Sequence, residues 1–446
     1  NRYACGMDTT FSRRDFIEQS SLFTAGALTA GYTATAKGAA KNEKIQVGVI
    51  GAGGRAQRLM HELVKMPGVE ITALCDIFDV NLAKARQIAP KAATTDDFHT
   101  LLKRKDVDAV LIGSPDHWHV PMTVAACAAG KDVYVEKPLT HSLEEGAAVI
   151  RAQNEHKRVV QVGTQQRSMP QFHKAKQLIE QGALGKVHKI HMSWNRNHAP
   201  FKKRVPDIKP HQVDWERFLG NAPKQPFEPY RFHRNWRWFW DFGGGILTDL
   251  MVHWMDSVHY LWPIGLPEST TSIGAQYTTK GTWETPDTIQ TLMEFPKHGT
   301  QLHFEGTFSC QHRKAGTTLM GENATLYIDR GRLELTPEPG RKAKPTEMVL
   351  GKGGKGADFS SINGEALHLA DWLQAVRERR KPSAPAEAGV AAAAVAFAEE
   401  IARQTDVPIP VKCCTSVEAA RREYTDETII FGNPDMLAEV LPNMPA

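Results

Sequence analysis

Short apolar segments alternate with longer amphipathic segments in the first third of the chain, from Lys44 onward. The apolar segments are rich in Val and Ile and have the length of strands, whereas the segments between them have the length of helices. Strands that alternate with helices form a parallel sheet with helices on both faces, so we expect a doubly wound α/β domain here. The predicted strands are IQVGVI (45–50), VEITALC (69–75), VDAVLIG (107–113), DVYVE (132–136) and RVVQVG (158–163).

A second series of apolar segments, with partial alternation, predicts the strands of a second domain. A turn-rich stretch at 351–357 follows, and helices are expected near 364–379 and 386–404. The last of these contains GVAAAAVAFAEE, whose persistent apolar positions favour a packed helix over a low-complexity linker. The predicted strands are 186–195, 271–279, 287–295, 301–309, 317–321, 324–329 and 332–335.

Composition is that of a protein with a sizeable core: 446 residues, of which 41% are hydrophobic and 23% charged, favour two domains over one. The net charge of +4 is spread without a Lys/Arg block, which favours a small-molecule partner over nucleic acid or an anionic membrane. Six cysteines show no CxxC pair, and the adjacent Cys413 and Cys414 are interpreted as ordinary strand or loop residues. Neither a disulfide framework nor a zinc site is expected.

The amino-terminal 40 residues have the pattern of an export signal. SRRDFI (12–17) precedes a mildly apolar stretch rich in Ala, Gly and Thr that is too short and polar to span a bilayer. This resembles a twin-arginine signal, with cleavage after Ala34-Thr35-Ala36 and with Met7 as a possible start; a disordered basic leader is the alternative. We therefore expect residues 1–40 to be a signal peptide of a bacterial protein that is exported, for example to the periplasm, and that does not insert in the membrane after cleavage.

A glycine-rich turn, GAGGRA (51–56), follows the first predicted strand and precedes a predicted helix. It fits the pattern G-x-G-x-x-A of dinucleotide-binding Rossmann folds, in which Gly51 allows the tight turn and Gly53 lets the backbone approach a pyrophosphate. Free N–H groups at the start of the helix then hold the phosphate charge. Gly54 and Arg55 lie in the same turn and are predicted to contact the cofactor.

The second predicted strand ends at Asp76, which lies 25 residues after Gly51. A carboxylate at this point accepts hydrogen bonds from the adenosine ribose and repels a 2′-phosphate. NAD is therefore favoured over NADP, although Arg55 and Arg58 keep NADP open as an alternative.

Two further segments follow strands of the first sheet, at the edge where ligands of such sheets bind. SPDHWH (114–119) follows the strand at 107–113, and EKP (136–138) follows the strand at 132–136. His117 and His119 have the spacing of a metal pair, but no third and fourth ligand can be identified, so no metal is predicted. The cofactor contacts expected from these segments are Ser114, Pro115, His117, His119, Glu136 and Lys137.

The stretch DFGGGILTDLMVHWMD (241–256) places Asp249 and His253 four residues apart on a predicted helix. This spacing directs both side chains to one face, and a pair of this kind is most often a structural hydrogen bond. The glycine-rich turn and the lysine of EKP raise the alternative that the pair belongs to a catalytic site.

GAGGRA, SPDHWH, VYVEKPLTHS and GGGILTDLMVHWMD occur in the order and approximate spacing of the Gfo/Idh/MocA oxidoreductase family, which the chain resembles over residues 44–404. The resemblance implies a Rossmann domain at 41–165 and a substrate-binding α/β domain at 166–360 with an open, mainly antiparallel sheet. That sheet often serves as an oligomer interface in the family, so a homo-oligomer, dimer or tetramer, is expected. Residues 361–446 are expected to form helices that pack back on the Rossmann domain and a tail.

The resemblance also implies a catalytic triad of Lys137, Asp249 and His253. Hydride removal from a sugar carbon requires that the hydroxyl on that carbon lose its proton. A neutral His253 is suited to accept it, and the Lys137 ammonium to stabilise the developing alkoxide. The sequence leaves open the exchange of these two roles, and Asp249 could fix the histidine or grip a neighbouring hydroxyl.

An aromatic segment, YRFHRNWRWFW (230–240), precedes the DxxxH stretch. Tryptophan faces with interleaved cationic side chains suit a pyranose, although such clusters more often pack between domains. The residues predicted to bind substrate are Arg167, His233, Trp236 and Arg237.

The expected function is that of an NAD-dependent oxidoreductase acting on a hydroxyl carbon of a sugar, glycoside or cyclitol. Because free NAD is scarce outside the cytoplasm, an exported enzyme is expected to keep its cofactor bound and to regenerate it. Redox-neutral cleavage of glycosides is the alternative, although family members of that type usually replace the DxxxH segment, which this chain retains. A non-catalytic nucleotide-holding protein is the third hypothesis.

Overall fold

The computed structural model describes residues 44–197, 207–350, 363–405, 409–413 and 429–431. The predicted signal peptide lies outside these residues. Within them, no helix is long and apolar enough to cross a membrane. The same described ranges contain no group of three or more His, Cys, Asp or Glu placed to hold a metal ion.

Six parallel strands form the first sheet, in the order β3-β2-β1-β4-β5-β6. The chain moves outward from β1 in one direction and then returns to continue from β1 in the other, which confirms the predicted doubly wound sheet. The short strand β3 was not predicted. The strands are β1 (Ile45–Ile50), β2 (Val69–Cys75), β3 (Ala93–Thr95), β4 (Ala109–Ile112), β5 (Asp132–Val135) and β6 (Val160–Val162).

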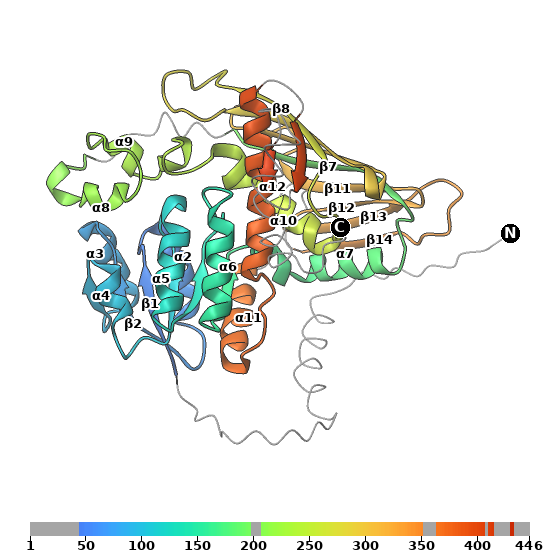
Figure 1. Cartoon of the computed structure of the whole chain (residues 1–446). Helices are drawn as coiled ribbons and strands as arrows, with labels where there is room; N and C mark the ends of the chain where they lie inside the picture. Colours follow the sequence, from blue (N-terminus) through green and yellow to red (C-terminus); the bar gives the residue numbers. More distant parts are fainter. Residues whose placement is uncertain (1–43, 198–206, 351–362, 406–408, 414–428, 432–446) are drawn as a thin grey trace, which may run out of the picture.

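Helices connect these strands and cover both faces of the sheet (Figure 1). Local signals fix their ends: Asp97, for example, precedes α4 and accepts hydrogen bonds from the backbone N–H groups of His99 and Thr100. The helices are α2 (Gly54–Leu63), α3 (Asp79–Ile88), α4 (Phe98–Leu102), η2 (Asp116–Trp118), α5 (His119–Ala128), α6 (Glu145–Glu155) and η3 (Gln165–Ser168).

A second, mainly antiparallel sheet of ten strands lies beside the first domain, as predicted (Figure 1). Its order is β14-β13-β12-β11-β7-β10-β9-β8-β15-β16, with β7 and β10 pairing in parallel. Strand β9 alternates strictly between buried and exposed residues, so one face of the sheet meets the core. The strands are β7 (Val187–Asn195), β8 (Ser269–Ala275), β9 (Thr288–Phe295), β10 (Thr300–Thr307), β11 (Ala315–Gly321), β12 (Ala324–Ile328), β13 (Arg332–Pro337), β14 (Thr346–Val349), β15 (Ile409–Cys413) and β16 (Ile429–Phe431).

Four long helices pack against the two sheets, and one of them, α12, contacts both domains. α7 (Pro170–Glu180) and α10 (Val252–Leu261) pack together on the second domain, and α12 (Ala386–Thr405) contacts α6 and β6 on one side and α10 and β8 on the other. α11 (Gly364–Glu378) packs against α2 and completes the core of the first sheet with Leu369 and Trp372. The carboxyl-terminal helices therefore hold the first domain against the second.

A bridging segment, residues 208–240, runs from the second domain over the carboxyl edge of the first sheet, where α8 and α9 lie above α3 in Figure 1. Val213 forms an antiparallel β-bridge with Phe78, and the backbone N–H of Asp214 donates to the Ile77 carbonyl at 3.4 Å. Its elements are η5 (Pro210–Gln212), α8 (Trp215–Leu219), α9 (Pro229–Phe232) and η6 (Trp236–Trp238).

Candidate active site

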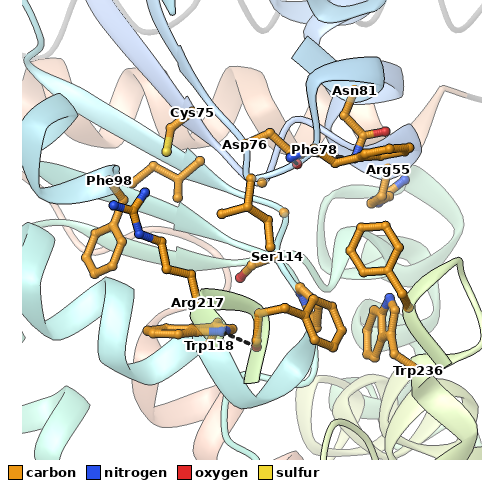
Figure 2. A pocket seen from close by; sticks show the side chains of 18 of the residues that line it. Arg55, Cys75, Asp76, Phe78, Asn81, Phe98, Ser114, Trp118, Arg217 and Trp236 are labelled. Atoms are coloured by element: carbon orange, nitrogen blue, oxygen red, sulfur yellow. Dashed lines mark hydrogen bonds between the residues drawn. The ribbon is translucent and has the colours of Figure 1, made fainter. Parts of the chain in front are cut away.

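Two adjoining cavities open at the carboxyl edge of the first sheet. The larger, of about 610 Å³, lies between the glycine turn and the bridging segment (Figure 2). The smaller, of about 270 Å³, lies between the end of β5 and the second domain. Side chains that line both are Arg55, Ser114, Trp236 and Arg237.

The glycine turn forms one wall of the larger cavity. Gly51 has φ +73°, and a Cβ at this position would lie 2.6 Å from the backbone nitrogen of Ser114, so only glycine fits. Helix α2 begins at Gly54, and both Gly53 and Gly54 line the cavity. The first N–H groups of a helix lack partners within it, so this wall fits the phosphates of a dinucleotide.

Asp76 directly follows β2 and lines the same cavity, where it was predicted to contact the ribose. One of its carboxylate oxygens accepts from the Phe78 N–H at 2.9 Å, and the other from Asn81 Nδ2 at 3.1 Å. Burial outweighs these bonds and raises the pKa of Asp76 to about 7. The carboxyl group is therefore oriented by its own loop and presents its remaining lone pairs to a bound nucleotide.

Neither histidine of SPDHWH lines the larger cavity, so the structure adds no support to the prediction that they contact the cofactor. His117 lines neither cavity, and its Nε2 lies 2.8 Å from the Phe218 carbonyl of the bridging segment. His119 lines the smaller cavity, but its ring nitrogens lie 2.6 Å from the Pro138 carbonyl and 3.0 Å from the Ser114 carbonyl. Burial lowers the pKa of each to about 4, so both are neutral and hold loops together.

Trp118, which the sequence analysis did not single out, takes the place expected for these histidines. Its ring lines the larger cavity beside Ser114 and Pro115, and its Nε1 donates to the Phe218 carbonyl at 2.9 Å (Figure 2). The hydrogen bond therefore holds the bridging segment to the first domain beside the larger cavity.

Lys137 and Asp249 meet in the smaller cavity. The Lys137 Nζ donates to the Asp249 backbone carbonyl at 2.5 Å and to its Oδ1 at 2.8 Å. Arg237 Nε donates to the same Oδ1 at 3.2 Å. Burial alone would raise the pKa of Asp249, but Lys137 and Arg237 outweigh it and hold this pKa well below its usual range. Asp249 is therefore ionised and holds the lysine, rather than the histidine, in place.

The segment that carries Asp249 differs from the regular helix predicted for it. Asp249 lies in a π-helical turn, η7 (Leu247–Met251), directly before α10. Gly245, just upstream, has φ +64°, and a Cβ there would lie 2.6 Å from the Thr285 side chain, which explains a glycine in this tight approach. Isolated π-turns of this kind are frequent at functional sites.

His253 lies in the first turn of α10 and also lines the smaller cavity. Burial, with added repulsion from Lys137 and Arg330, lowers the pKa of His253 well below 6.5. Its ring stacks on Trp194 with centroids 5.5 Å apart, and its Nδ1 has no hydrogen-bond partner among the residues that the structure describes. The imidazole is therefore neutral and able to accept a proton.

Arg55 and Glu136, both predicted to contact the cofactor, bind each other. Arg55 Nε donates to Glu136 at 2.8 Å, and its Nη1 donates to Glu365 of α11 at 2.5 Å. Arg58 also donates to Glu365, at 2.7 Å. This network joins the glycine-turn helix to α11, and Glu365 was missed because nothing in its local sequence links it to a residue 310 positions away.

The predicted substrate residues fall into different places. Trp236 and Arg237 line both cavities, whereas His233 lines the larger one alone. Arg167 lines neither: its Nε donates to both oxygens of the buried Asp256 at 2.9 Å, so the structure adds no support to the prediction that it binds substrate. Residues of the smaller cavity that were not predicted include Gln165, Trp194, Arg196 and Arg330.

Comparison with known proteins agrees with this architecture. Residues 45–164 match the model of the oxidoreductase family with an NAD-binding Rossmann fold, and residues 172–334 match the GFO/IDH/MocA C-terminal domain. A solved levoglucosan dehydrogenase, in complex with NADH and levoglucosan, has a TM-score of 0.65 at 20% identity and covers 82% of this chain and 99% of its own. The aldose-aldose oxidoreductase of Caulobacter crescentus, complexed with glycerol, has a TM-score of 0.64 at 19% identity, covering 82% of this chain and 100% of its own.

Sequence relatives match over shorter stretches. A glycosyl hydrolase family 109 protein of Solibacter usitatus is 37% identical over 155 residues, 31% of this chain and 35% of that protein. The uncharacterized oxidoreductase YrbE of Bacillus subtilis is 26% identical over 219 residues, 49% of this chain and 54% of that protein. The chain thus spans between a third and about half of these curated relatives. The two matched domains together cover more than half of the chain, so the chain belongs to the Gfo/Idh/MocA oxidoreductase family.

Proposed function

We propose that this enzyme transfers a hydride between the hydroxyl-bearing carbon of a sugar, glycoside or cyclitol and a tightly held NAD. The observation that carries the proposal is the meeting of Lys137, Asp249 and His253 in one cavity that adjoins the glycine-turn cavity. NAD supplies the hydride acceptor. A substrate in the smaller cavity would lie between these three side chains and the cofactor.

The charges of the three residues support one assignment of roles. His253 is neutral because its pKa is lowered, so it accepts the hydroxyl proton. Lys137, held by the Asp249 carboxylate at 2.8 Å, donates a hydrogen bond to the developing alkoxide. Asp249 positions the lysine and binds no proton in the reaction, because its pKa is held low.

The bridging segment supports retention of the cofactor through the catalytic cycle. Phe218, Phe232 and Trp236 line the larger cavity from this segment and face the glycine turn. A cofactor held in this way would be reoxidised on the enzyme by a second substrate or by the same one. Retention of the cofactor suits an enzyme that is exported by the twin-arginine route. The support for this route remains the pattern SRRDFI at 12–17.

We further propose that the enzyme is a dimer or tetramer built on the outer face of the second sheet. Ile273 and Leu292, on the neighbouring strands β8 and β9, expose 71% and 57% of their surface. Large apolar side chains on an open sheet face are typical of an interface between subunits.

Redox-neutral cleavage of glycosides is the second candidate. Its support is the 37% identity to a glycosyl hydrolase family 109 protein over 155 residues. In such a reaction a transient ketone acidifies the neighbouring C–H and permits elimination of the aglycone, after which the ketone is reduced again. The Asp249 and His253 pair, which this chain keeps, favours the dehydrogenase.

One experiment separates these functions. The purified protein is analysed for released nucleotide and then incubated with mixed sugars and glycosides while ketone, NADH and aglycone are followed by mass spectrometry and absorbance. A keto-sugar with reduced cofactor, or a keto-sugar paired with a reduced second sugar, supports the oxidoreductase. Free aglycone without net NADH supports cleavage. Bound nucleotide without any product would leave a non-catalytic binding protein.

A further inference from the structure

Two cationic side chains of the larger cavity stand apart from the other three. Five Arg or Lys residues line this cavity, and three of them form ion pairs with carboxylates. Among the residues that the structure describes, no ion pair joins a carboxylate to the other two, Lys84 and Arg234. Exposed cations are ordinary on a protein surface, so the position of these two decides whether they serve a ligand. The ion pairs are Arg55 with Glu136, Arg217 with Asp96, and Arg237 with Asp249.

Arg234 lies over the glycine turn. It belongs to the bridging segment, between α9 and η6, and a Cβ atom added to Gly54 would lie 3.8 Å from its Nη2. Helix α2 begins at Gly54, so the guanidinium group is close to the N–H groups that start this helix. The Phe232 ring, two residues earlier, meets the Phe78 ring edge-on with centroids 5.4 Å apart and keeps this part of the bridging segment against the first domain. An anion at the start of α2 would therefore also be within reach of Arg234.

Lys84 and His233 lie near Arg234 at the same end of the cavity. Burial, together with repulsion from Arg234 and Lys84, lowers the pKa of His233. Lys84 is in α3, three residues after Asn81, whose Nδ2 would lie 3.5 Å from a Cβ atom added to Gly53. Positive charge therefore flanks the glycine turn from α3 on one side and from the bridging segment on the other.

We propose that Arg234, with Lys84 beside it, binds the pyrophosphate of the nucleotide, and that this contact helps to hold the bridging segment over the cofactor. The inference rests on the proposed function only for the identity of the cofactor, NAD. The glycine turn offers N–H groups to the phosphates, whereas the guanidinium fork offers a full charge and two parallel hydrogen bonds. Phosphate charge would also relieve the repulsion between the two cations, so that nucleotide binding and closure of the bridging segment favour each other.

A 2′-phosphate is the other phosphate that these cations could bind, and the geometry argues against it. Asp76 lies where the ribose is expected, and its carboxylate would repel a phosphate on the ribose. Arg234, by contrast, lies over Gly54, at the start of the helix that fits the pyrophosphate. Ligands with and without each phosphate separate the two sources.

The test compares the binding of adenosine, ADP-ribose, NAD and NADP to the wild type and to Arg234→Asn. Bound nucleotide is first removed, and affinity is measured by competition with a fluorescent NAD analogue, so that turnover is not needed. We expect the variant to bind NAD and ADP-ribose about tenfold more weakly and adenosine within about twofold of the wild type. A loss confined to NADP, an equal loss for adenosine, or no loss for any ligand would overturn the pyrophosphate assignment.

The backbone of Arg234 makes Asn the informative replacement. Arg234 has φ +66°, a left-handed conformation that Asn adopts with less strain than other side chains. The melting temperature of the nucleotide-free variant should therefore not fall, whereas a fall would show that the arginine has a structural role and would contradict the proposal. Positive φ alone does not indicate a ligand, because Arg313, which is exposed and lines neither cavity, has φ +57°. Arg313→Asn is therefore the matched control and should leave nucleotide affinity unchanged.

Salt provides a second measurement of the same contact. Ions screen exposed charges, so the wild-type affinity for NAD should fall as NaCl is raised, and it should fall less steeply in Arg234→Asn. Arg234→Lys, which keeps the charge but not the fork, should lie between the two in both affinity and salt dependence. Equal salt dependence in the wild type and in Arg234→Asn would contradict an electrostatic contact between this residue and the phosphates.

The outcomes also separate this inference from the proposed function. Nucleotide binding that depends on Arg234, without turnover of any sugar, would overturn the proposed oxidoreductase activity and leave the phosphate contact standing. Turnover of a sugar by Arg234→Asn with wild-type nucleotide affinity would do the reverse.

Discussion

The two cavities meet at Arg237 and Trp236 but are built from different chemistry. The larger is walled by aromatic rings, among them Phe98, Trp118 and Phe232, and by a turn in which Gly51 leaves no room for a Cβ atom. The smaller is walled by ion pairs and arginines. The aromatic walls therefore suit the larger cavity to a cofactor that stays bound. The charged and titratable side chains suit the smaller cavity to a substrate that reacts.

The two cavities also differ in the segments of the chain that form their walls. The larger cavity combines the first sheet with a segment that reaches over it, whereas the smaller one gathers Lys137 after β5, Asp249 in η7 and Arg330 after β12. A substitution in the larger cavity should therefore affect nucleotide binding, and a substitution in the smaller cavity should affect turnover. The four predictions below test this separation.

The largest effect is expected from Lys137→Ala. Removal of the donor to the developing alkoxide should lower turnover by about a hundredfold or more, with the bound nucleotide retained. Turnover is measured with the substrate found by product analysis, and nucleotide by its release on denaturation. Lys280→Ala, an exposed lysine, is the control. Unchanged turnover would remove Lys137 from the mechanism.

Gly51→Ala should weaken nucleotide binding, in contrast to Lys137→Ala, which should lower turnover and retain the nucleotide. The added Cβ meets the Ser114 backbone at 2.6 Å with φ at +73°, so the turn must shift and nucleotide affinity should fall by about tenfold. Gly340→Ala is the matched control, because it has φ +77° with nothing within 4 Å of the new Cβ. Equal nucleotide loss in both variants would mean that backbone strain, rather than the cavity wall, is responsible.

Trp118→Phe tests the attachment of the bridging segment. It removes the bond from Nε1 to the Phe218 carbonyl but keeps an aromatic ring, and one hydrogen bond of about 1 kcal/mol corresponds to roughly fivefold faster nucleotide release. The rate is followed by displacement with a fluorescent analogue. Trp215→Phe loses a similar bond, to the Gln225 carbonyl, within the segment itself and should leave the rate unchanged.

The smallest effect concerns pH. A histidine base is active when neutral, so a pKa lowered below 6.5 extends activity to lower pH. The acid limb of the kcat/KM profile should therefore lie below pH 6.5. A limb at or above pH 6.5 would assign the proton transfer to another group.

The sequence predicted the parts of the site that depend on local structure. Gly51, Asp76 and Lys137 each end or follow a strand, and the carboxyl ends of parallel strands meet at one edge whatever the rest of the chain does. Five of the six strands of the first sheet were predictable from the alternation of apolar and amphipathic segments, whereas the short strand β3 was not.

The parts of the site that depend on contacts between segments far apart in the sequence were not predictable. Arg330 reaches the cavity because β12 pairs with β11, and β11 with β7, which places it beside Trp194. The contacts of His117 and His119 with backbone carbonyls could not be predicted, because residue spacing does not show which distant backbone groups a ring will meet. The π-turn at Asp249 has no signal in a pattern that assumes regular helical spacing.

The packing of α11 has a consequence for how the protein is made. Leu369 and Trp372 fill the same core as Tyr134 and the apolar residues of β1, although more than two hundred residues separate them along the chain. A ribosome that has finished the first sheet has therefore not yet supplied the helix that seals it. The nascent sheet must wait with one apolar patch bare until residues 364–378 have also emerged.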